Sequence, residues 1–370
     1  HPEVDIVAEL FGGTDIARKL ILEALEHGKH VVTANKKLLA EYGNEIFALA
    51  EKNNLMVQFE AAVAGGIPII KALREGLAAN NIQSIAGIIN GTSNFILSEM
   101  REKGSAFVDV LKEAQALGYA EADPTFDIEG HDAGHKITIM SALAFGTPMN
   151  FEACYLEGIS RLESRDIQYA EELGYRIKLL GITRKTEQGI ELRVHPTLVP
   201  ESRLIANVNG VMNAVRVDAN MVGETMYYGP GAGSRPTASS VVADIIDISR
   251  LISADSGNRV PHLAFQPTQV QKQRILSIDE ITSSYYLRVR VEDKPGVLGR
   301  IAGLLADENV SIEALIQKGV QDDSTPEIVI LTHSTQEKKV KKAIAAIEEL
   351  PFVHQSVVMI RMESLHGRQG

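Results

Sequence analysis

Apolar and polar positions at the start of the chain change from short apolar runs to an amphipathic stretch. Residues 4–11 and 29–35 are each apolar enough for a buried strand, and residues 14–28 between them repeat apolar positions at helical spacing. Thr14 is expected to cap this helix with its side chain. A strand, a helix and a strand within about 30 residues form one βαβ unit of a doubly wound parallel sheet.

The middle of the chain has a mixed pattern. Residues 59–76 run from a strand through a Gly-Gly turn into a helix with Pro68 in its first turn. Further strands are predicted at 83–90, 175–183, 190–199, 213–219 and 223–229, and further helices at 105–118, 131–146, 164–174 and 237–253. This order indicates an α+β domain.

Two local details complete the prediction for the middle segment. Thr92 and Ser93 follow the strand 83–90 and suit the N-cap of the next helix. The helix 105–118 is amphipathic and is expected to turn Val108, Leu111 and the stretch 114–117 toward the core.

Periodicity is weak over residues 254–283, which predicts a linker, and it returns from residue 285 onward. The order there is strand 285–293, helix 294–310, strands 311–320 and 326–334, helix 336–350 and strand 352–363. We therefore expect α/β architecture in three parts: a partial dinucleotide-binding domain (1–58), a catalytic, substrate and dimerisation domain (59–253), and a βαββαβ regulatory domain (284–370).

Composition and charge exclude several classes of function. The 370 residues are 45% hydrophobic and 23% charged, with a net charge of −11. No Lys/Arg run is present, which argues against nucleic acid or an anionic membrane as a partner. No apolar run approaches the roughly 20 residues that span a bilayer. The single Cys154 allows no internal disulfide and is expected to be buried, so a cytoplasmic location is predicted.

The stretch 118–136, GYAEADPTFDIEGHDAGHK, carries the strongest chemical signal. An irregular acidic segment precedes a helix that begins near His131, and Asp132 and Lys136 stand four positions apart on one helix face. A lysine held by a carboxylate beside an acidic segment can bind or protonate a small polar substrate. The alternative is a solvated ion pair at a helix start.

This whole segment resembles the active-site signature of homoserine dehydrogenase. The matching positions are Tyr119, Glu121, Asp123, Pro124, Asp127, Gly130, Asp132 and Lys136. The resemblance implies NAD(P)-dependent interconversion of L-aspartate 4-semialdehyde and L-homoserine, in threonine, methionine and isoleucine biosynthesis. It implies that Lys136 supplies the proton and Asp132 orients it. Glu121, Asp127, Tyr119 and Thr92 would contact the substrate.

The same resemblance concerns the cofactor. It implies that Asn35 and Lys36, in TANKK just past the second strand, and Gly233 in GPGAGS bind NADP or NAD. The chain shows no Gly-rich turn after its first strand, and GPGAGS lacks the third glycine of that fingerprint. We therefore expect that roughly 60–80 residues of the nucleotide-binding domain are absent from this chain. Weak cofactor binding and an inactive chain would follow.

Two further implied sites involve main-chain groups. By resemblance, Glu60 and the carbonyls of Val63, Gly65 and Ile67 would hold a monovalent cation such as sodium. The turn D-K-P-G-V-L at 293–298 resembles that of an ACT domain, a module that binds small amino acids. It implies an amino acid effector, threonine by pathway logic, on the amides near Pro295-Gly296 and on Asn309.

Three alternatives stay open from the sequence. The chain could be a non-catalytic amino acid sensor on an enzyme scaffold, or another semialdehyde or imine reductase. The regulatory module could serve dimerisation alone. ACT-type modules pair edge to edge, so a homodimer or homotetramer is expected. The residues do not distinguish NAD from NADP.

Overall fold

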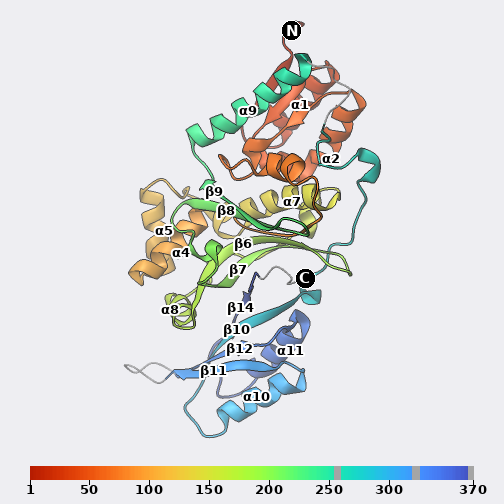
Figure 1. Ribbon diagram of the computed structural model, residues 1–370. Coiled ribbons are helices and arrows are strands. Elements are labelled where there is room, and N and C mark those ends of the chain that lie inside the picture. Colours follow the sequence, from red (N-terminus) through yellow and green to blue (C-terminus); the bar gives the residue numbers. More distant parts are fainter. Residues whose placement is uncertain (254–259, 319–325, 366–370) are drawn as a thin grey trace.

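The computed structural model describes residues 1–253, 260–318 and 326–365. Figure 1 shows three bodies in a row: a small N-terminal sheet with its helices, a central sheet covered by α7, and a C-terminal module. Residues 254–259, 319–325 and 366–370, which include the start of the predicted linker, lie outside the described part. Within the described residues, no helix is both long and apolar enough to span a membrane.

The N-terminal body is the predicted βαβ arrangement. It contains β1 (Ile6–Glu9), α1 (Asp15–Glu26), β2 (His30–Thr33), α2 (Lys36–Lys52) and β3 (Val57–Gln58). The strands are parallel in the order β1-β2-β3. Helix α9 (Ser234–Ser253) returns from far along the chain, and its Val241 and Ile248 pack with Val32 and Met56. The first sheet is therefore completed by a helix that belongs to the middle of the sequence.

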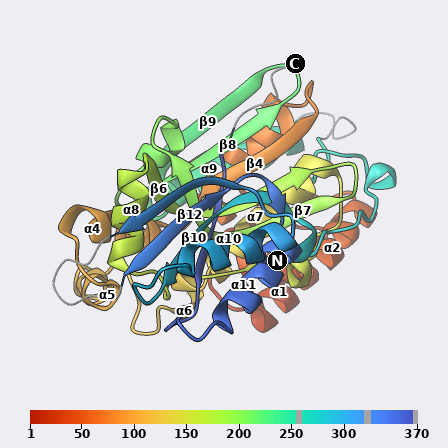
Figure 2. The same cartoon turned by 90° about the horizontal axis from the view of Figure 1, so that it is seen from below.

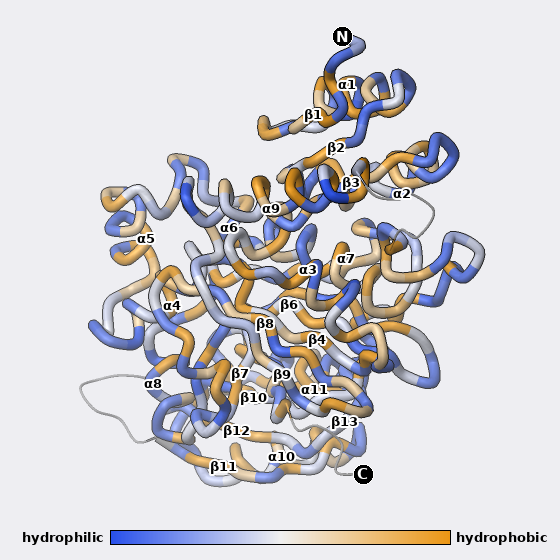
Figure 3. Tube along the Cα trace, turned by 45° about the horizontal axis from the view of Figure 1, so that its top comes forward, coloured by the Kyte–Doolittle hydropathy of each residue, from blue (hydrophilic) through white to orange (hydrophobic). Residues whose placement is uncertain are grey.

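The central body is built around one helix and one antiparallel sheet. Its strands are β4 (Ile82–Ile88), β6 (Tyr175–Lys185), β7 (Ile190–Pro200), β8 (Met212–Ala219) and β9 (Gly223–Pro230). Helix α7 (His131–Phe145) is buried from Asp132 to Phe145 because it lies between this sheet and α2. Helices α4 (Gly91–Lys103), α5 (Phe107–Ala116) and α8 (Ser164–Glu172) flank the sheet. Figure 3 shows hydrophobic positions gathered along these central strands.

The C-terminal module has the predicted βαββαβ order. Its elements are β10 (Thr282–Arg290), α10 (Val297–Asp307), β11 (Ile312–Lys318), β12 (Glu327–Thr332), α11 (Glu337–Glu348) and β14 (Val358–Met362). Strand β14 also pairs in parallel with β7, through Arg361 opposite Thr197 and Met362 opposite Leu198. The sheet therefore runs without interruption in the order β11-β12-β10-β14-β7-β6-β4-β8-β9. Figure 2 shows β4, β8 and β9 side by side at one end of this order.

Shorter elements connect these bodies. They are η1 (Glu60–Ala62), α3 (Ile69–Lys71), a π-helical turn η2 (Ala72–Gly76), α6 (Thr125–Ile128), η3 (Phe151–Ala153), β5 (Tyr155–Leu156), η4 (Leu204–Asn207), η5 (Pro267–Gln269), η6 (Ile278–Glu280) and β13 (Thr335–Gln336). Residues 260–281 run along the side of the central body, where Ile275 bridges to Ile190 (Figure 1). Cys154 is buried, as expected.

Three local predictions were wrong. Thr14 makes no side-chain cap for α1. Asn90, not Thr92 or Ser93, caps α4, because its side chain accepts the Ser93 amide at 2.8 Å. Val108 and Leu117 are 58% and 55% exposed, since α5 turns its other face toward the core.

Candidate functional site

Four separate elements meet at the acidic loop, which we define as residues 118–130. The loop holds α6 and leads into the first turns of α7, where Asp132 and Lys136 lie. Strand β4 ends beside it and places Asn90 there, and α2 brings Lys36 from the N-terminal body. Polar groups at strand ends and helix starts from two bodies are thus joined at one point.

The carboxylate of Asp132 is the centre of this site. Its Oδ2 accepts from Lys136 Nζ at 2.7 Å, and its Oδ1 lies 2.9 Å from Lys36 Nζ. Asn90 Nδ2 donates to Asp132 Oδ2 at 2.9 Å. Asp132 is only 3% exposed. Burial opposes its charge, but the two lysines outweigh burial and hold the pKa of Asp132 well below its ordinary value.

The two lysines differ in environment. Burial lowers the pKa of Lys136, whose ammonium donates to Asp132 and, at 2.7 Å, to the carbonyl of Ile89. Burial also acts on Lys36, but the charges of Asp132, Asp127 and Glu121 outweigh it, so the pKa of Lys36 is raised. Lys136 is therefore the easier of the two to deprotonate. Opposite pKa shifts in two neighbouring groups are typical of a site where one group exchanges a proton and the other keeps its charge.

The acidic loop surrounds this centre with the predicted polar residues. Asp127 Oδ1 accepts from Asn90 Nδ2 at 2.7 Å, and burial, followed by the charge of Asp132, raises the pKa of Asp127. Thr92 Oγ1 donates to the carbonyl of Tyr119 at 2.6 Å. Tyr119 and Glu121 are exposed. The structure thus brings together the catalytic and substrate-binding candidates, and Thr92 connects the loop to the first turn of α4.

Asn90 is a site residue that the sequence analysis did not identify. It connects Asp127 and Asp132 and also caps α4, so one side chain fixes both carboxylates relative to β4. A polar residue at the end of a buried apolar strand is a detectable signal, because a buried polar side chain needs hydrogen-bond partners. The strand at 83–90 carried that signal.

The cofactor candidates lie at the edge of the N-terminal sheet and on the turn before α9. Asn35 is buried, and its Nδ2 donates to the carbonyl of Gly13 at 2.7 Å while its Oδ1 caps α2. Gly233 has a φ of 117°. The Lys36 side chain is 34% exposed and remains accessible to a ligand. An ammonium and a glycine turn at a helix start suit a phosphate or a carboxamide, so these residues fit a nicotinamide cofactor.

The predicted cation loop has a clear structural role for Glu60. Its carboxylate oxygens accept the amides of Ile70 at 2.8 Å and Lys71 at 2.9 Å, so Glu60 stabilises the start of the following helix. Burial raises its pKa to about 7. The carbonyl of Gly65 accepts from Ser240 Oγ at 2.7 Å, and that of Ile67 accepts the Ile69 amide. In the described residues, no group of three His, Cys, Asp or Glu side chains could hold a metal ion.

Comparisons with known families account for most of the chain. The family model of the homoserine dehydrogenase NAD binding domain matches residues 1–60, and that of homoserine dehydrogenase itself matches residues 68–246. The ACT domain model matches residues 285–352. These matches follow the three bodies of the structure.

Individual relatives agree. The homoserine dehydrogenase of Neisseria gonorrhoeae is 80% identical over 364 residues, which cover 98% of this chain and 84% of that protein. A crystal structure of a homoserine dehydrogenase from Thiobacillus denitrificans superposes with a TM-score of 0.95 at 63% identity, covering 99% of this chain and 83% of that one.

A more distant structure adds the cofactor. A hyperthermophilic archaeal homoserine dehydrogenase in complex with NADPH matches with a TM-score of 0.57 at 33% identity, covering 66% of this chain and 71% of that one. The chain belongs to the homoserine dehydrogenase family, whose members are nicotinamide-dependent oxidoreductases that interconvert L-aspartate 4-semialdehyde and L-homoserine, and it carries a C-terminal ACT domain.

Proposed function

We propose that the acidic loop and the Lys36–Asp132–Lys136 cluster form the substrate site of the homoserine dehydrogenase reaction. The observation that carries this proposal is the single buried carboxylate of Asp132 shared by two lysines whose pKa values shift in opposite directions. One lysine is suited to exchange a proton and the other to remain a cation.

Lys136 is the proton donor in this proposal. An ammonium has three N–H donors, and within the described residues Asp132 and the Ile89 carbonyl take two of them. The third points to the aldehyde oxygen of the substrate. When bound, the nicotinamide supplies the hydride that the aldehyde carbon receives. Lys136 then gives its proton to the oxygen, and Asp132 stays ionised and holds the lysine in place.

The acidic residues recognise the other end of the substrate. Glu121 would take the ammonium group, because it is exposed and its charge reaches the same space as Lys36. Asp127 and Tyr119 would complete the polar shell, and Thr92 would keep Tyr119 in position through its hydrogen bond to the Tyr119 carbonyl. A zwitterionic amino acid aldehyde or alcohol matches this arrangement of charges.

Replacing Glu121 by alanine is expected to raise KM for homoserine about 10- to 150-fold and to leave kcat within about twofold. The lost contact is to the ammonium group, which does not react, and a hydrogen bond to a charged group contributes about 1.5–3 kcal/mol. Steady-state kinetics of the holoenzyme measures both constants. Glu113→Ala is the control, because Glu113 is paired with Lys103 at the surface. A drop in kcat at unchanged KM would contradict the proposal.

Lys36, Asn35 and Gly233 would form the cofactor side of the site, for NADP or NAD. Lys36 would contact cofactor and substrate together, because its ammonium reaches Asp132 from the N-terminal body. Asn35 would act indirectly, because its side chain holds the backbone at Gly13 in place through a hydrogen bond to the Gly13 carbonyl. A monovalent cation such as sodium would sit at Glu60 with the carbonyls of Val63, Gly65 and Ile67. Its support is that these four residues are all buried within one short loop.

The ACT domain binds an amino acid effector, and we propose threonine. Gly296 precedes α10 and Asn309 follows it, so the two lie at opposite ends of an 11-residue helix that is about 16 Å long. One small amino acid cannot touch both in the same chain. A homodimer or homotetramer in which a second copy supplies one of the two positions would resolve this, and β11 is available as an edge strand.

Threonine is expected to raise the melting temperature of the protein, and Gly296→Leu is expected to abolish that shift. Gly296 has a φ of 90°, so a side chain there strains the turn and covers its amides. A thermal-shift screen against the common amino acids provides the measurement. Gly299→Ala, within α10 and in open space, is the matched control. No shift with any amino acid would instead favour a dimerisation role.

A further inference from the structure

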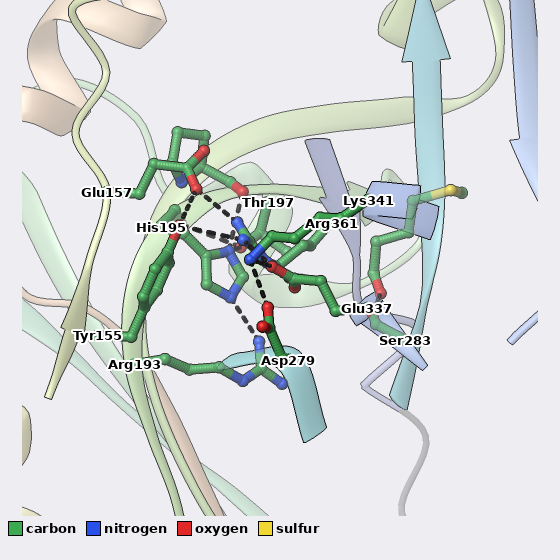
Figure 4. Close-up of polar contacts among 12 residues, drawn as sticks. Tyr155, Glu157, Arg193, His195, Thr197, Asp279, Ser283, Glu337, Lys341 and Arg361 are labelled. Atoms are coloured by element: carbon green, nitrogen blue, oxygen red, sulfur yellow. Dashed lines mark hydrogen bonds and ion pairs between the residues drawn. The ribbon is translucent and has the colours of Figure 1, made fainter. Parts of the chain in front are cut away.

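The contact between the ACT domain and the central body contains a fully buried arginine. Arg361 on β14 makes a two-point contact with Glu337 of α11, with Nε–Oε2 at 2.6 Å and Nη2–Oε1 at 2.7 Å. Both side chains are 0% exposed. The third guanidinium nitrogen of Arg361, Nη1, donates to Glu157 Oε2 of the central body at 2.7 Å. Figure 4 shows Arg361 between the two carboxylates.

Glu157 is held on the central body by its own neighbours. Tyr155 Oη donates to Glu157 Oε2 at 2.7 Å. The Arg361 Cζ atom lies over the Tyr155 ring, 4.9 Å from the ring centroid. The Glu157 amide donates to the carbonyl of Val194 on β7 at 2.9 Å. Burial raises the pKa of Tyr155 to about 12, so its hydroxyl keeps its proton at neutral pH. Glu157 therefore connects β5 and β7 of the central body with Arg361 of the ACT domain.

The residues directly after Glu157 contact the acidic loop. The Ile159 amide donates to the carbonyl of Ile128 at 2.8 Å. Gly158 lies so close that a Cβ there would be 2.4 Å from the Ile128 carbonyl oxygen and 2.4 Å from Glu129 Oε2. Ile128 and Glu129 stand between Asp127 and Asp132 in the chain. Only one residue therefore separates the Arg361 ion pair from the backbone contact to the substrate site.

A second ionic contact joins the same two bodies elsewhere. Arg288 of β10 binds Asp166 of α8 at 2.6 and 2.9 Å, and Arg165 reaches Glu327 at 2.9 Å. Among the hydrogen bonds and ion pairs of the described residues, those of Arg165, Asp166 and Glu327 do not involve the acidic loop. This second contact also includes Glu163, four residues beyond Ile159, whereas the first one is followed directly by the Gly158 and Ile159 contacts to the loop.

We propose that Glu157 is a positioning residue through which the ACT domain, by way of Arg361, sets the position of the acidic loop. The inference rests on the proposed function in that the loop is taken as the substrate site. Movement of α11 carries Glu337, and Arg361 follows because it is bound at two points. The resulting displacement of Glu157 is then transmitted to Ile128 through Gly158 and the hydrogen bond of the Ile159 amide.

Hydrogen exchange of the whole chain tests this coupling without substrate or cofactor. Glu157→Gln keeps the shape of the side chain and removes the charge that binds Arg361. We expect the amide of Ile159 and those of residues 125–130 to exchange about two- to thirtyfold faster. Arg165→Gln is the matched control, because it breaks an ion pair to the ACT domain at the second contact and should leave these amides unchanged.

Arg361→Met tests the other end of the pair. Glu337 retains Lys341 at 3.0 Å as a partner, so the variant is expected to fold. The double variant with Glu157→Gln should exchange no faster than either single variant, because both substitutions break the same contact between Arg361 and Glu157. Additive effects, or equal effects of Arg165→Gln, would overturn the proposal and leave a structural contact only.

Kinetics separates this proposal from the assignment of the site. In the holoenzyme, Glu157→Gln should raise KM for homoserine about two- to thirtyfold with kcat within about twofold, because Asp127 moves while Lys136 remains on α7. A wild-type enzyme with a complete nucleotide-binding domain and bound cofactor that does not oxidise homoserine would refute the proposed function, and the exchange result would still judge the coupling. Faster exchange with unchanged KM would refute the effect on the substrate site.

Discussion

Replacing Lys136 by alanine is expected to lower kcat for homoserine oxidation by about 10²–10⁴-fold with little change in cofactor affinity. The ammonium of Lys136 is buried against Asp132 and the Ile89 carbonyl, so it is aimed from a fixed position rather than from a mobile surface chain. Alanine removes an interaction that is made mainly in the transition state. Steady-state kinetics in both directions and cofactor titration, on an enzyme with a complete nucleotide-binding domain, provide the measurements.

Lys36→Ala is the informative comparison, since Lys36 binds the other oxygen of the same carboxylate. Its pKa is raised by the carboxylates around it against the effect of burial, so it should remain charged through the reaction. We expect its loss to weaken binding more than turnover. Near-full kcat in Lys136→Ala together with a large loss in Lys36→Ala would place the proton donor on the dinucleotide side. The acidic loop would then be a binding platform alone.

The Asp132–Lys136 pair could be predicted from the sequence because both residues lie on one helix, where a spacing of four fixes their proximity. The partners that complete the site could not. Lys36 and Asn90 reach Asp132 from other elements, and their distances depend on how α2 and β4 pack on α7. Local periodicity contains no information on that packing.

The same limit applies to the fold. The order of elements in the ACT domain was predicted, since each helix and strand has its own apolar repeat. The parallel pairing of β14 with β7 was not, because it is short, with Arg361 and Met362 opposite Thr197 and Leu198, and nothing in their sequence marks a partner. The packing of α9 on the first sheet was not predicted either, because nothing in the sequence of α9 indicates which element it contacts. Thr92 suited a helix cap by type, but the competing Asn90 occupies that place.

Asp132→Asn is expected to lower kcat by about 10–10³-fold, between the wild type and Lys136→Ala. The amide keeps the size of the side chain but removes the charge that orients both lysines. Removing one partner of a buried ion pair normally costs about 3–5 kcal/mol of stability. Here Lys136 can lose its proton instead, since burial already lowers its pKa. We therefore expect a folded enzyme with a changed pH profile.

The direction of that change follows from the roles of the two groups. Homoserine oxidation needs neutral Lys136 to accept the alcohol proton, so its rate rises as pH increases through the pKa of Lys136. The charge of Asp132 raises that pKa against the effect of burial. Without this charge the pKa falls further, and the rising limb of kcat/KM should move to lower pH. Asp123→Asn removes the same charge from an exposed position that binds Thr125, and should leave the limb in place. A limb that stays fixed or moves to higher pH in Asp132→Asn would show that Lys136 is not the group that titrates.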